Sequence, residues 1–259
     1  HCGEDLMFDK SLLEGKRILV TGGGSGLGKE MSKHFLTYGA EVIICGRRDE
    51  VLQKAAKELA DETKGKVTAH SLDIRDSLAI EETINNVFDE GPLDGLVNNA
   101  AGNFISRTND LSPNGFNAIA SIVFHGTFNM TNTVGKKWIE LKQPGTILSI
   151  TTTWVWTGSP FVVPSAMSKS GINAMTKSLA VEWGPHNIRL NCIAPGPFPT
   201  EGAWSRLSPD TEATEGAMDQ SSMSSNPMGR VGEMNELGNL ATFLMADGCD
   251  YLTGQTIAI

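Results

Sequence analysis

The chain has 259 residues, of which 40% are hydrophobic and 20% are charged, and its formal net charge is −9. This length suffices for one α/β domain with a sizeable core, and an acidic chain without a basic block argues against nucleic acid or a membrane surface as the main partner. The four cysteines show no C-x-x-C spacing, so we expect no metal site. Because no apolar run is as long as a membrane span and no signal peptide is recognisable, we expect a cytoplasmic protein.

Short apolar runs predict buried strands, and the amphipathic stretches between them predict helices. In chain order we expect a strand at 17–21, a helix at 27–38, a strand at 41–45, a helix at 50–63, a strand at 66–72, a helix at 77–90, a strand at 95–98, a long helix that starts at Ser112-Pro113, a strand at 145–151, a helix at 165–183, a strand at 188–193 and a last strand at 255–259.

This alternation predicts one α/β domain over residues 1–259, with a doubly wound parallel sheet and helices on both faces. Ligands of such sheets bind beyond the carboxyl ends of the strands. The segment at about 198–228 is rich in Ser, Thr, Pro and Glu, and we expect it to form a lid over the site.

A glycine-rich turn follows the first expected strand and opens the first expected helix. Its residues are Gly22, Gly23, Gly24, Ser25, Gly26, Leu27 and Gly28. Glycines let the backbone approach a pyrophosphate closely, and the helix N-terminus adds free N–H groups and a positive dipole end. The context of strand, turn and helix therefore favours a dinucleotide site over a glycine turn without a ligand.

The end of the second expected strand indicates which dinucleotide binds. A cofactor with a free ribose 2′-hydroxyl usually meets Asp or Glu there. Here the strand is followed by Arg47 and Arg48, and two guanidinium groups suit a 2′-phosphate, which they hold by forked, charge-assisted hydrogen bonds. We therefore predict NADP(H); the alternative is that both arginines are solvated side chains at a helix start.

Four further motifs follow expected strands or lie in the next helix. They are LDIRD at 72–76, NNAAG at 98–102, Lys169, and PGP at 195–197. Together with the glycine-rich turn, they resemble the short-chain dehydrogenase/reductase family from Lys16 to Ile259. The resemblance implies a Rossmann-type fold and a role for each matching position.

In that family the position of Asp73, with Ile74 beside it, contacts adenine, Asn99 and Ala100 line the floor of the cofactor site, and Lys169 binds the nicotinamide ribose. The positions that flank the nicotinamide are Pro195, Gly196, Pro197 and Phe198.

Four longer stretches are more specific: NNAAGNFIS at 98–106, LSPN at 111–114, TGSPFVVPSA at 157–166 and GAWSRL at 202–207. They resemble the 2,4-dienoyl-CoA reductase branch of the family, which acts in fatty acid β-oxidation. This resemblance implies an acyl-CoA substrate and a homo-oligomer, either a dimer or a tetramer. It implies that Asn103 holds the thioester oxygen and that Ser165 completes the polar shell beside the nicotinamide ribose. The positions implied along the acyl-CoA are Arg75, Phe104, Ser112 and Arg206.

The chain departs from the family at the proton-donating tyrosine. Four residues before Lys169, where the general family has tyrosine, stands Ser165, and at the earlier position used by the dienoyl-CoA branch stands Trp154. The only tyrosines are Tyr38, at the end of the first helix, and Tyr251, before the last strand, and we expect neither to act as the acid.

This loss disfavours ketone reduction, because a general acid for the alcohol oxygen is worth roughly 10²–10⁴ in rate. An indole donates a hydrogen bond but does not release a proton near neutral pH. Reduction of a carbon–carbon double bond conjugated to a thioester needs donors to an enolate-like oxygen, and Asn103 with Trp154 supply such donors. We therefore favour reduction of a 2,4-dienoyl- or 2-enoyl-CoA, with water protonating carbon.

Two residues keep two interpretations each. His125 stands where the family usually has a structural asparagine, and is either a replacement acid or relay near Lys169 or a histidine of helix packing. Trp154 is either the substitute donor or, like Trp156, an aromatic wall. Two other functions stay open: a cofactor-binding pseudoenzyme that acts through a partner, and a reductase of a carbonyl or an activated alkene without CoA.

Overall fold

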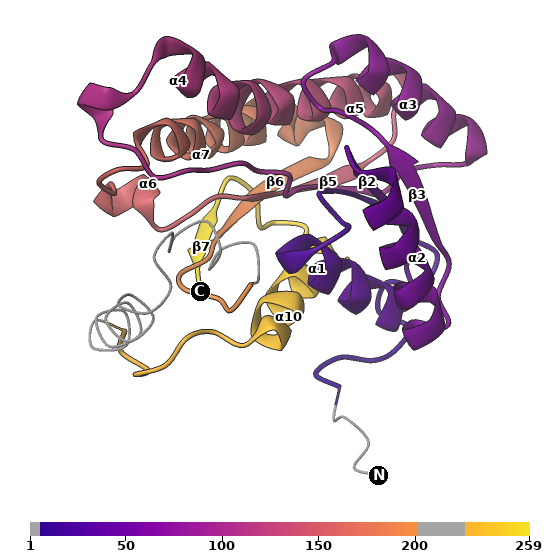
Figure 1. Cartoon of the computed structure of the whole chain (residues 1–259). Coiled ribbons are helices and arrows are strands. Elements are labelled where there is room, and N and C mark those ends of the chain that lie inside the picture. The colour runs from indigo at the N-terminus through magenta and orange to yellow at the C-terminus, as the bar shows by residue number, and fades with distance from the viewer. Residues whose placement is uncertain (1–5, 201–225) are drawn as a thin grey trace.

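The computed structural model describes residues 6–200 and 226–259 (Figure 1). In these residues a single sheet has seven strands in the order β3-β2-β1-β4-β5-β6-β7, and every neighbouring pair is parallel. The strands are β1 Arg17–Thr21, β2 Glu41–Gly46, β3 Val67–Ser71, β4 Gly95–Asn98, β5 Gly145–Ile150, β6 Ile188–Ala194 and β7 Thr256–Ala258. They agree with the seven expected strands, and the Rossmann-type, doubly wound α/β fold is confirmed.

Helices cover both faces of the sheet (Figure 1). One face carries α1 (Gly26–Thr37), α2 (Asp49–Thr63) and α10 (Met234–Met245). The other carries α3 (Ser77–Glu90), α4 (Pro113–Ala120), α5 (Thr127–Leu141) and α7 (Val163–Trp183). Short helical segments are η1 (Thr108–Asp110), η2 (Ser121–Gly126), α6 (Trp154–Thr157) and η3 (Gly184–His186). In the described part of the chain, no helix is long and apolar enough to cross a membrane.

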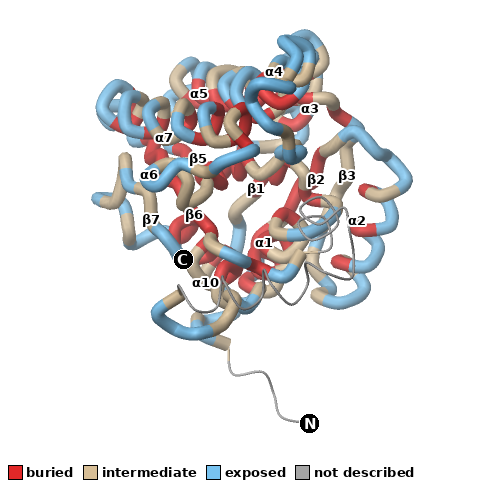
Figure 2. Tube along the Cα trace, turned by 60° about the vertical axis from the view of Figure 1, so that its left-hand side comes forward, coloured by how far each residue is buried: buried red, intermediate tan, exposed pale blue. Residues whose placement is uncertain are grey.

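Each face of the sheet has its own apolar core. Alternate residues of a strand point to opposite faces, so Ile18 and Val20 of β1 pack with α1 and α10, whereas Leu19 packs with α3 and α5. The buried Trp138 of α5 anchors the second core, and its indole N–H donates to the Leu93 carbonyl at 2.6 Å. Figure 2 shows the buried residues concentrated in the sheet and the inner sides of the helices.

The long helix expected after Ser112 is interrupted. Ser112 does cap α4, because its hydroxyl accepts a hydrogen bond from the Gly115 N–H at 3.1 Å, and Pro113 occupies the first turn. A π-helical turn at Ser121–Gly126 then separates α4 from α5. Such turns occur often near functional sites.

Helix α10 was not expected from the sequence. Its start carries a capping box, in which the Glu236 carboxylate accepts from the Glu233 N–H at 2.8 Å and the Glu233 side chain accepts from the backbone N–H of Glu236. An acidic residue followed three positions later by Glu was the available signal. The helix packs on α1, where His34 Nε2 lies 2.9 Å from Asn235 Oδ1.

The strand order reverses between β1 and β4. Connections from these two strands leave in opposite directions, which opens a crevice at their carboxyl ends. The turns after β1 and β4 carry the glycine-rich motif and the NNAAG motif, so the fold brings both motifs to this crevice.

Candidate active site

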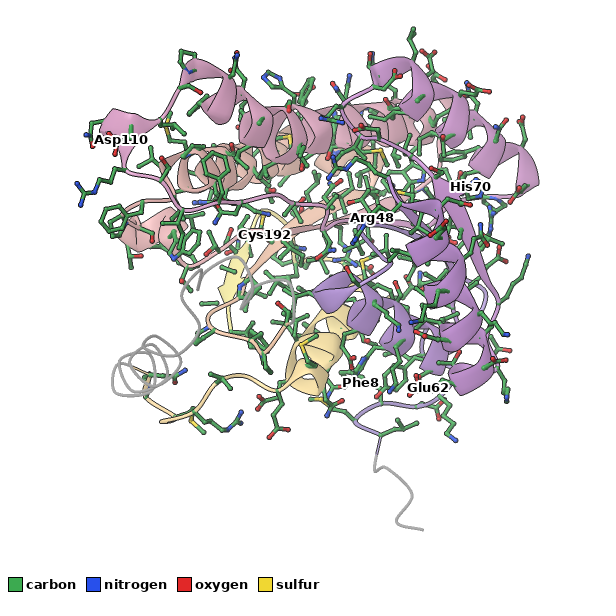
Figure 3. The ribbon with its side chains drawn as sticks, in the orientation of Figure 1. Phe8, Arg48, Glu62, His70, Asp110 and Cys192 are labelled. Carbon is green, nitrogen blue, oxygen red and sulfur yellow. The ribbon has the colours of Figure 1, made fainter. Side chains whose placement is uncertain are left out.

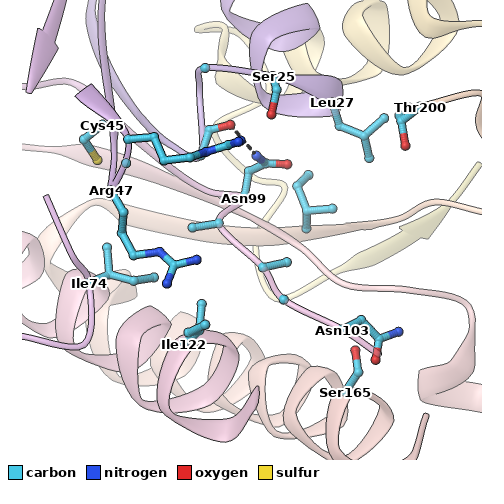
Figure 4. Close-up of a pocket in the computed structure, with 18 of the residues that line it drawn as sticks. Ser25, Leu27, Cys45, Arg47, Ile74, Asn99, Asn103, Ile122, Ser165 and Thr200 are labelled. Atoms are coloured by element: carbon cyan, nitrogen blue, oxygen red, sulfur yellow. Dashed lines mark hydrogen bonds between the residues drawn. The ribbon is translucent and has the colours of Figure 1, made fainter. Parts of the chain in front are cut away.

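A cavity of about 440 Å³ lies at the carboxyl ends of the strands. Its lining comes from the turns after β1, β2, β3, β4, β5 and β6 and from α7. In Figure 4, Arg47 lies toward one end of the cavity, and Asn103 and Ser165 lie toward the other. The lining brings together these residues predicted from the sequence: Gly22, Gly24, Ser25, Leu27, Arg47, Arg48, Asp73, Ile74, Asn99, Ala100, Asn103, Phe104, Trp154, Ser165, Lys169 and Pro195.

The glycine-rich turn has no room for side chains at its inner positions. Gly22 has a φ of +66°, and a Cβ at Gly28 would clash with the Gly22 carbonyl oxygen and with Asn99 Nδ2. Gly23 has Ile44 behind it, and Gly23, Gly26 and Gly28 shape the turn without lining the cavity. The Ser25 hydroxyl makes no capping bond within the described start of α1, so the helix N-terminus remains available to an anion.

Thr21 fixes the floor of the cavity. Its hydroxyl oxygen accepts hydrogen bonds from the Asn99 and Ala100 N–H groups, each at 3.0 Å, and Asn99 Nδ2 donates to the Thr21 and Gly22 carbonyls at 3.1 and 3.2 Å. The ends of β1 and β4 are thereby joined under the glycine-rich turn. Sequence reasoning missed Thr21, although it is the last residue of the first strand and directly precedes the motif.

The positive end of the cavity is formed by Arg47 and Arg48, both exposed, with Asp73 nearby. Arg48 precedes the first turn of α2, as Figure 3 shows, whereas Glu62 lies toward the other end of that helix. Cys45 also lines this end, and burial raises the pKa of its thiol to about 12, so the thiol is neutral.

Lys169 is the buried cation of the site. Its Nζ donates a hydrogen bond to the Ile150 carbonyl at the end of β5, and burial lowers the pKa of the ammonium group to about 8. At neutral pH most of the population is therefore protonated and can donate to a ligand.

Hydrogen-bonding groups surround the other end of the cavity. The Asn103 Oδ1 accepts from the Phe104 N–H at 2.9 Å, which leaves the Asn103 amide N–H₂ group to donate. Ser165, in the first turn of α7, is buried and lines the cavity, and Trp154 of α6 lines it as well. Phe104 contributes an apolar wall and lies close to Gly115 of α4.

Neither tyrosine of the chain lines the cavity within the described residues. Tyr38 is buried, with its ring edge-on to Phe8 at 5.6 Å, and Tyr251 is fully exposed beyond α10. The cavity therefore has no phenol that could replace the missing acid.

The structure does not bring every predicted residue to the cavity. His125 lies exposed on the π-helical turn, with its ring edge-on to Phe124 at 5.5 Å, and does not line the cavity. Arg75 binds the Asp73 carboxylate and Ser112 caps α4, and neither lines the cavity in the described residues. Arg206 and residues 201–225 of the expected lid lie outside the described residues.

The PGP segment is only partly at the cavity. Pro195 lines it, whereas the Gly196 N–H donates to the Ile259 carbonyl at 2.7 Å, and the Pro197 carbonyl accepts from the Gly232 N–H at 3.0 Å. Phe198 is buried against Gly232. Pro197 and Phe198 therefore pack against Gly232, so the described residues before 201 contact those after 225.

Other lining residues had no predicted role. Leu72, Ala101 and Gly102 lie within the LDIRD and NNAAG motifs, and the remaining ones are Cys45, Gly46, Val51, Leu52, Ile122, Ile150, Thr151, Thr152 and Thr200. Most follow the carboxyl end of a strand, and this position was the signal that would have indicated them.

Comparison with known proteins shows the family to which the chain belongs. The family model described as "Enoyl-(Acyl carrier protein) reductase" matches residues 22–259. The chain belongs to the short-chain dehydrogenase/reductase family. A short-chain dehydrogenase of Bacillus anthracis has a crystal structure that is similar with a TM-score of 0.84 and 37% identity, over 95% of each chain.

Two relatives within the short-chain dehydrogenase/reductase family carry names of the dienoyl-CoA branch. A probable 2,4-dienoyl-CoA reductase 3 of Caenorhabditis elegans, described as (3E)-enoyl-CoA-producing, is 41% identical over 99% of this chain and 82% of its own. A probable 2,4-dienoyl-CoA reductase of Bacillus subtilis, described as (2E)-enoyl-CoA-producing, is 39% identical over 95% of this chain and 96% of its own. The resemblance to this branch is confirmed. Other similar solved structures contain NADP or NADPH, and this short-chain dehydrogenase/reductase is an oxidoreductase with a nicotinamide cofactor.

Proposed function

We propose that the chain reduces a carbon–carbon double bond conjugated to a CoA thioester, with a 2,4-dienoyl-CoA or 2-enoyl-CoA as substrate and NADPH as cofactor. The observation that carries the proposal is a cavity whose described lining has several hydrogen-bond donors and no phenol. Such a site stabilises an oxyanion but lacks the usual acid for an alcohol oxygen.

The cavity fits the proposed cofactor on geometry. The close approach allowed at Gly22 and the free N-terminus of α1 suit a pyrophosphate, and Arg47 with Arg48 suits a 2′-phosphate. Lys169, protonated at neutral pH, would donate to the nicotinamide ribose. When bound, NADPH supplies the hydride of the reaction.

The remaining residues would act on the thioester. The amide N–H₂ of Asn103 would donate to the carbonyl oxygen, whose negative charge increases as hydride reaches the far end of the conjugated system. The Trp154 indole N–H or the Ser165 hydroxyl would give a second donor, since both residues line the same cavity. Neither group needs to release a proton, because water can protonate the carbon of the enolate.

The first experiment follows NADPH consumption with 2,4-hexadienoyl-CoA and with 2-hexenoyl-CoA, beside NADPH binding by fluorescence. Turnover of either thioester supports the proposal. Binding without turnover would indicate a pseudoenzyme, and oxidation of secondary alcohols without any dienoyl-CoA reduction would contradict the proposal. Turnover that does not depend on the pantetheine part would instead indicate an activated alkene without CoA.

Two variants separate the proposed donors. Asn103→Ala removes an oxyanion donor, and we expect kcat to fall by about 10²–10³ with NADPH affinity unchanged. Trp154→Phe keeps an aromatic wall and removes the indole N–H, so an unchanged kcat would assign Trp154 to the wall alone. A cytoplasmic location and a homo-oligomeric assembly stay predictions from the sequence.

A further inference from the structure

The turn after β3 places an acidic side chain inside the positive end of the cavity. Asp73 lines the same end as Arg47 and Arg48, and its side chain is 33% exposed. A carboxylate there is unfavourable for a phosphate group, because it repels the phosphate and competes with it for the arginines.

Arg75 pairs with this carboxylate. Its Nε donates to the two Asp73 oxygens at 2.9 and 3.0 Å, and its terminal nitrogen NH2 donates to Oδ2 at 2.5 Å. The Arg75 guanidinium thus faces Asp73 with Nε and NH2, in the forked geometry that suits a carboxylate. Arg75 itself does not line the cavity in the described part of the chain.

Arg47 lines the same cavity as Asp73, without an ion pair between the two side chains in the described structure. Hydrogen bonds from Arg75 are the largest cause that lowers the pKa of the Asp73 carboxyl, and the charge of Arg47 lowers this pKa further. Asp73 therefore stays ionised at neutral pH, and Arg47 is close enough for its charge to be felt there. If Arg75 were lost, Arg47 would be the next cation available to the carboxylate.

The other acid of this turn does not raise the same problem. Asp76 Oδ1 accepts from the Leu78 and Ala79 N–H groups at 3.0 and 3.1 Å and so caps α3. Its charge is stabilised by the positive end of that helix. Asp73 is thus the acidic residue of this turn that lines the cavity together with Arg47.

We propose that Arg75 determines cofactor specificity by acting through Asp73: it holds the carboxylate in a fork, and Arg47 with Arg48 is left to bind the 2′-phosphate of NADPH. Arg75 is therefore a positioning residue and not a ligand of the cofactor. This inference rests on the NADPH preference proposed above. It differs from the contact with acyl-CoA that the family resemblance implies for Arg75.

The test compares the affinities of NADPH and NADH for the wild type, Arg75→Met, Asp73→Asn and the double variant, by fluorescence titration. We expect Arg75→Met to weaken NADPH binding about fivefold, near the upper end for an exposed ion pair, and to change NADH binding less than about twofold. Asp73→Asn removes the competing charge, so in the Asp73→Asn background the change Arg75→Met should alter NADPH affinity by less than about twofold. Lys57→Met, which removes an exposed positive charge from α2, is the control for net charge.

Three results would overturn the inference. Equal weakening of NADPH and NADH by Arg75→Met would mean a structural role only. An effect of Arg75→Met on NADPH affinity as large in the Asp73→Asn background as in the wild type would exclude action through Asp73. An increased KM for dienoyl-CoA with unchanged NADPH affinity would assign Arg75 to the CoA. A wild-type protein that binds NADH as tightly as NADPH would contradict the proposed cofactor rather than the role of Arg75. The titration of the wild type alone gives this result, so the two failures are distinguishable.

Discussion

Replacing the buried Lys169 by methionine tests the electrostatics of the site most directly. Lys169 is only 7% exposed, and burial lowers the pKa of its ammonium group from 10.5 to about 8. A buried ammonium group costs folding free energy. We therefore expect Lys169→Met to make the cofactor-free protein more stable, even though it removes a group proposed to bind the nicotinamide ribose.

The magnitude follows from the pKa. The difference between 10.5 and about 8 is about 2.5, which corresponds to ~3 kcal/mol of destabilisation by the charged lysine. Loss of the hydrogen bond to Ile150 offsets ~1.5 kcal/mol of this gain. The net stabilisation of about 1–2 kcal/mol would raise Tm by about 2–6 °C in a domain of this size.

The gain should depend on pH with a definite sign. Between about pH 8 and 10.5 the unfolded chain keeps a proton on Lys169 that the folded chain has released, so the wild type becomes more stable as the pH rises through this window. The cost of the lysine is complete below about pH 8 and has vanished above about pH 10.5. The advantage of Lys169→Met should therefore be largest near neutral pH and small at about pH 9.5.

The assay is thermal unfolding by circular dichroism at both pH values, without cofactor, for the wild type, Lys169→Met and Lys177→Met. Lys177 is an exposed lysine of the same helix, and its replacement should leave Tm nearly unchanged. A Lys169→Met protein less stable than the wild type at neutral pH, or an advantage of equal size at both pH values, would refute the reasoning.

Three further predictions concern the cavity and its surroundings. Gly28→Ala should destabilise the fold by about 1–3 kcal/mol and abolish NADPH binding, because the new Cβ meets the Gly22 carbonyl oxygen. Gly184→Ala, with open space around it, should do neither. Chemical denaturation measures the stability of the two variants, and fluorescence titration measures their NADPH binding. Phe161 has a φ of +67°, so Phe161→Gly should be more stable to denaturant than Phe161→Ala by about 1 kcal/mol, and the reverse order would contradict this strain. His125→Asn should leave the pH dependence of the reduction rate unchanged, because His125 does not line the cavity in the described residues. A change in the pH–rate profile of this variant would support His125 as a proton relay.

Local signals in the sequence were enough for most of the architecture. The bounds of β1, β4 and α3 agree with the predicted bounds, because each element is an apolar or amphipathic run between strong turn residues. Helix α7 starts two residues before the predicted Ser165, and the long helix after Ser112 contains a π-helical turn. A local hydrophobic pattern indicates that a helix forms but does not determine where it begins or bends.

Part of the site was also predictable from the sequence, and part was not. The glycine-rich turn and Arg47 with Arg48 were recognisable from the sequence, because their chemistry depends on residue type and on the position after a strand. Asn103 and Lys169 were indicated by the family resemblance. The family resemblance located the missing tyrosine, and only the structure showed that no other tyrosine in the described residues replaces it.

Tertiary structure alone decided which side chains meet. The Thr21 hydroxyl joins Asn99 and Ala100 across two strands, and Arg75 turns toward Asp73 although the resemblance placed it on the acyl-CoA. His125 faces solvent although its spacing placed it near Lys169. A sequence pattern determines the face on which a residue lies, but a hydrogen bond or an ion pair forms only where packing brings two groups within about 3 Å in a suitable direction.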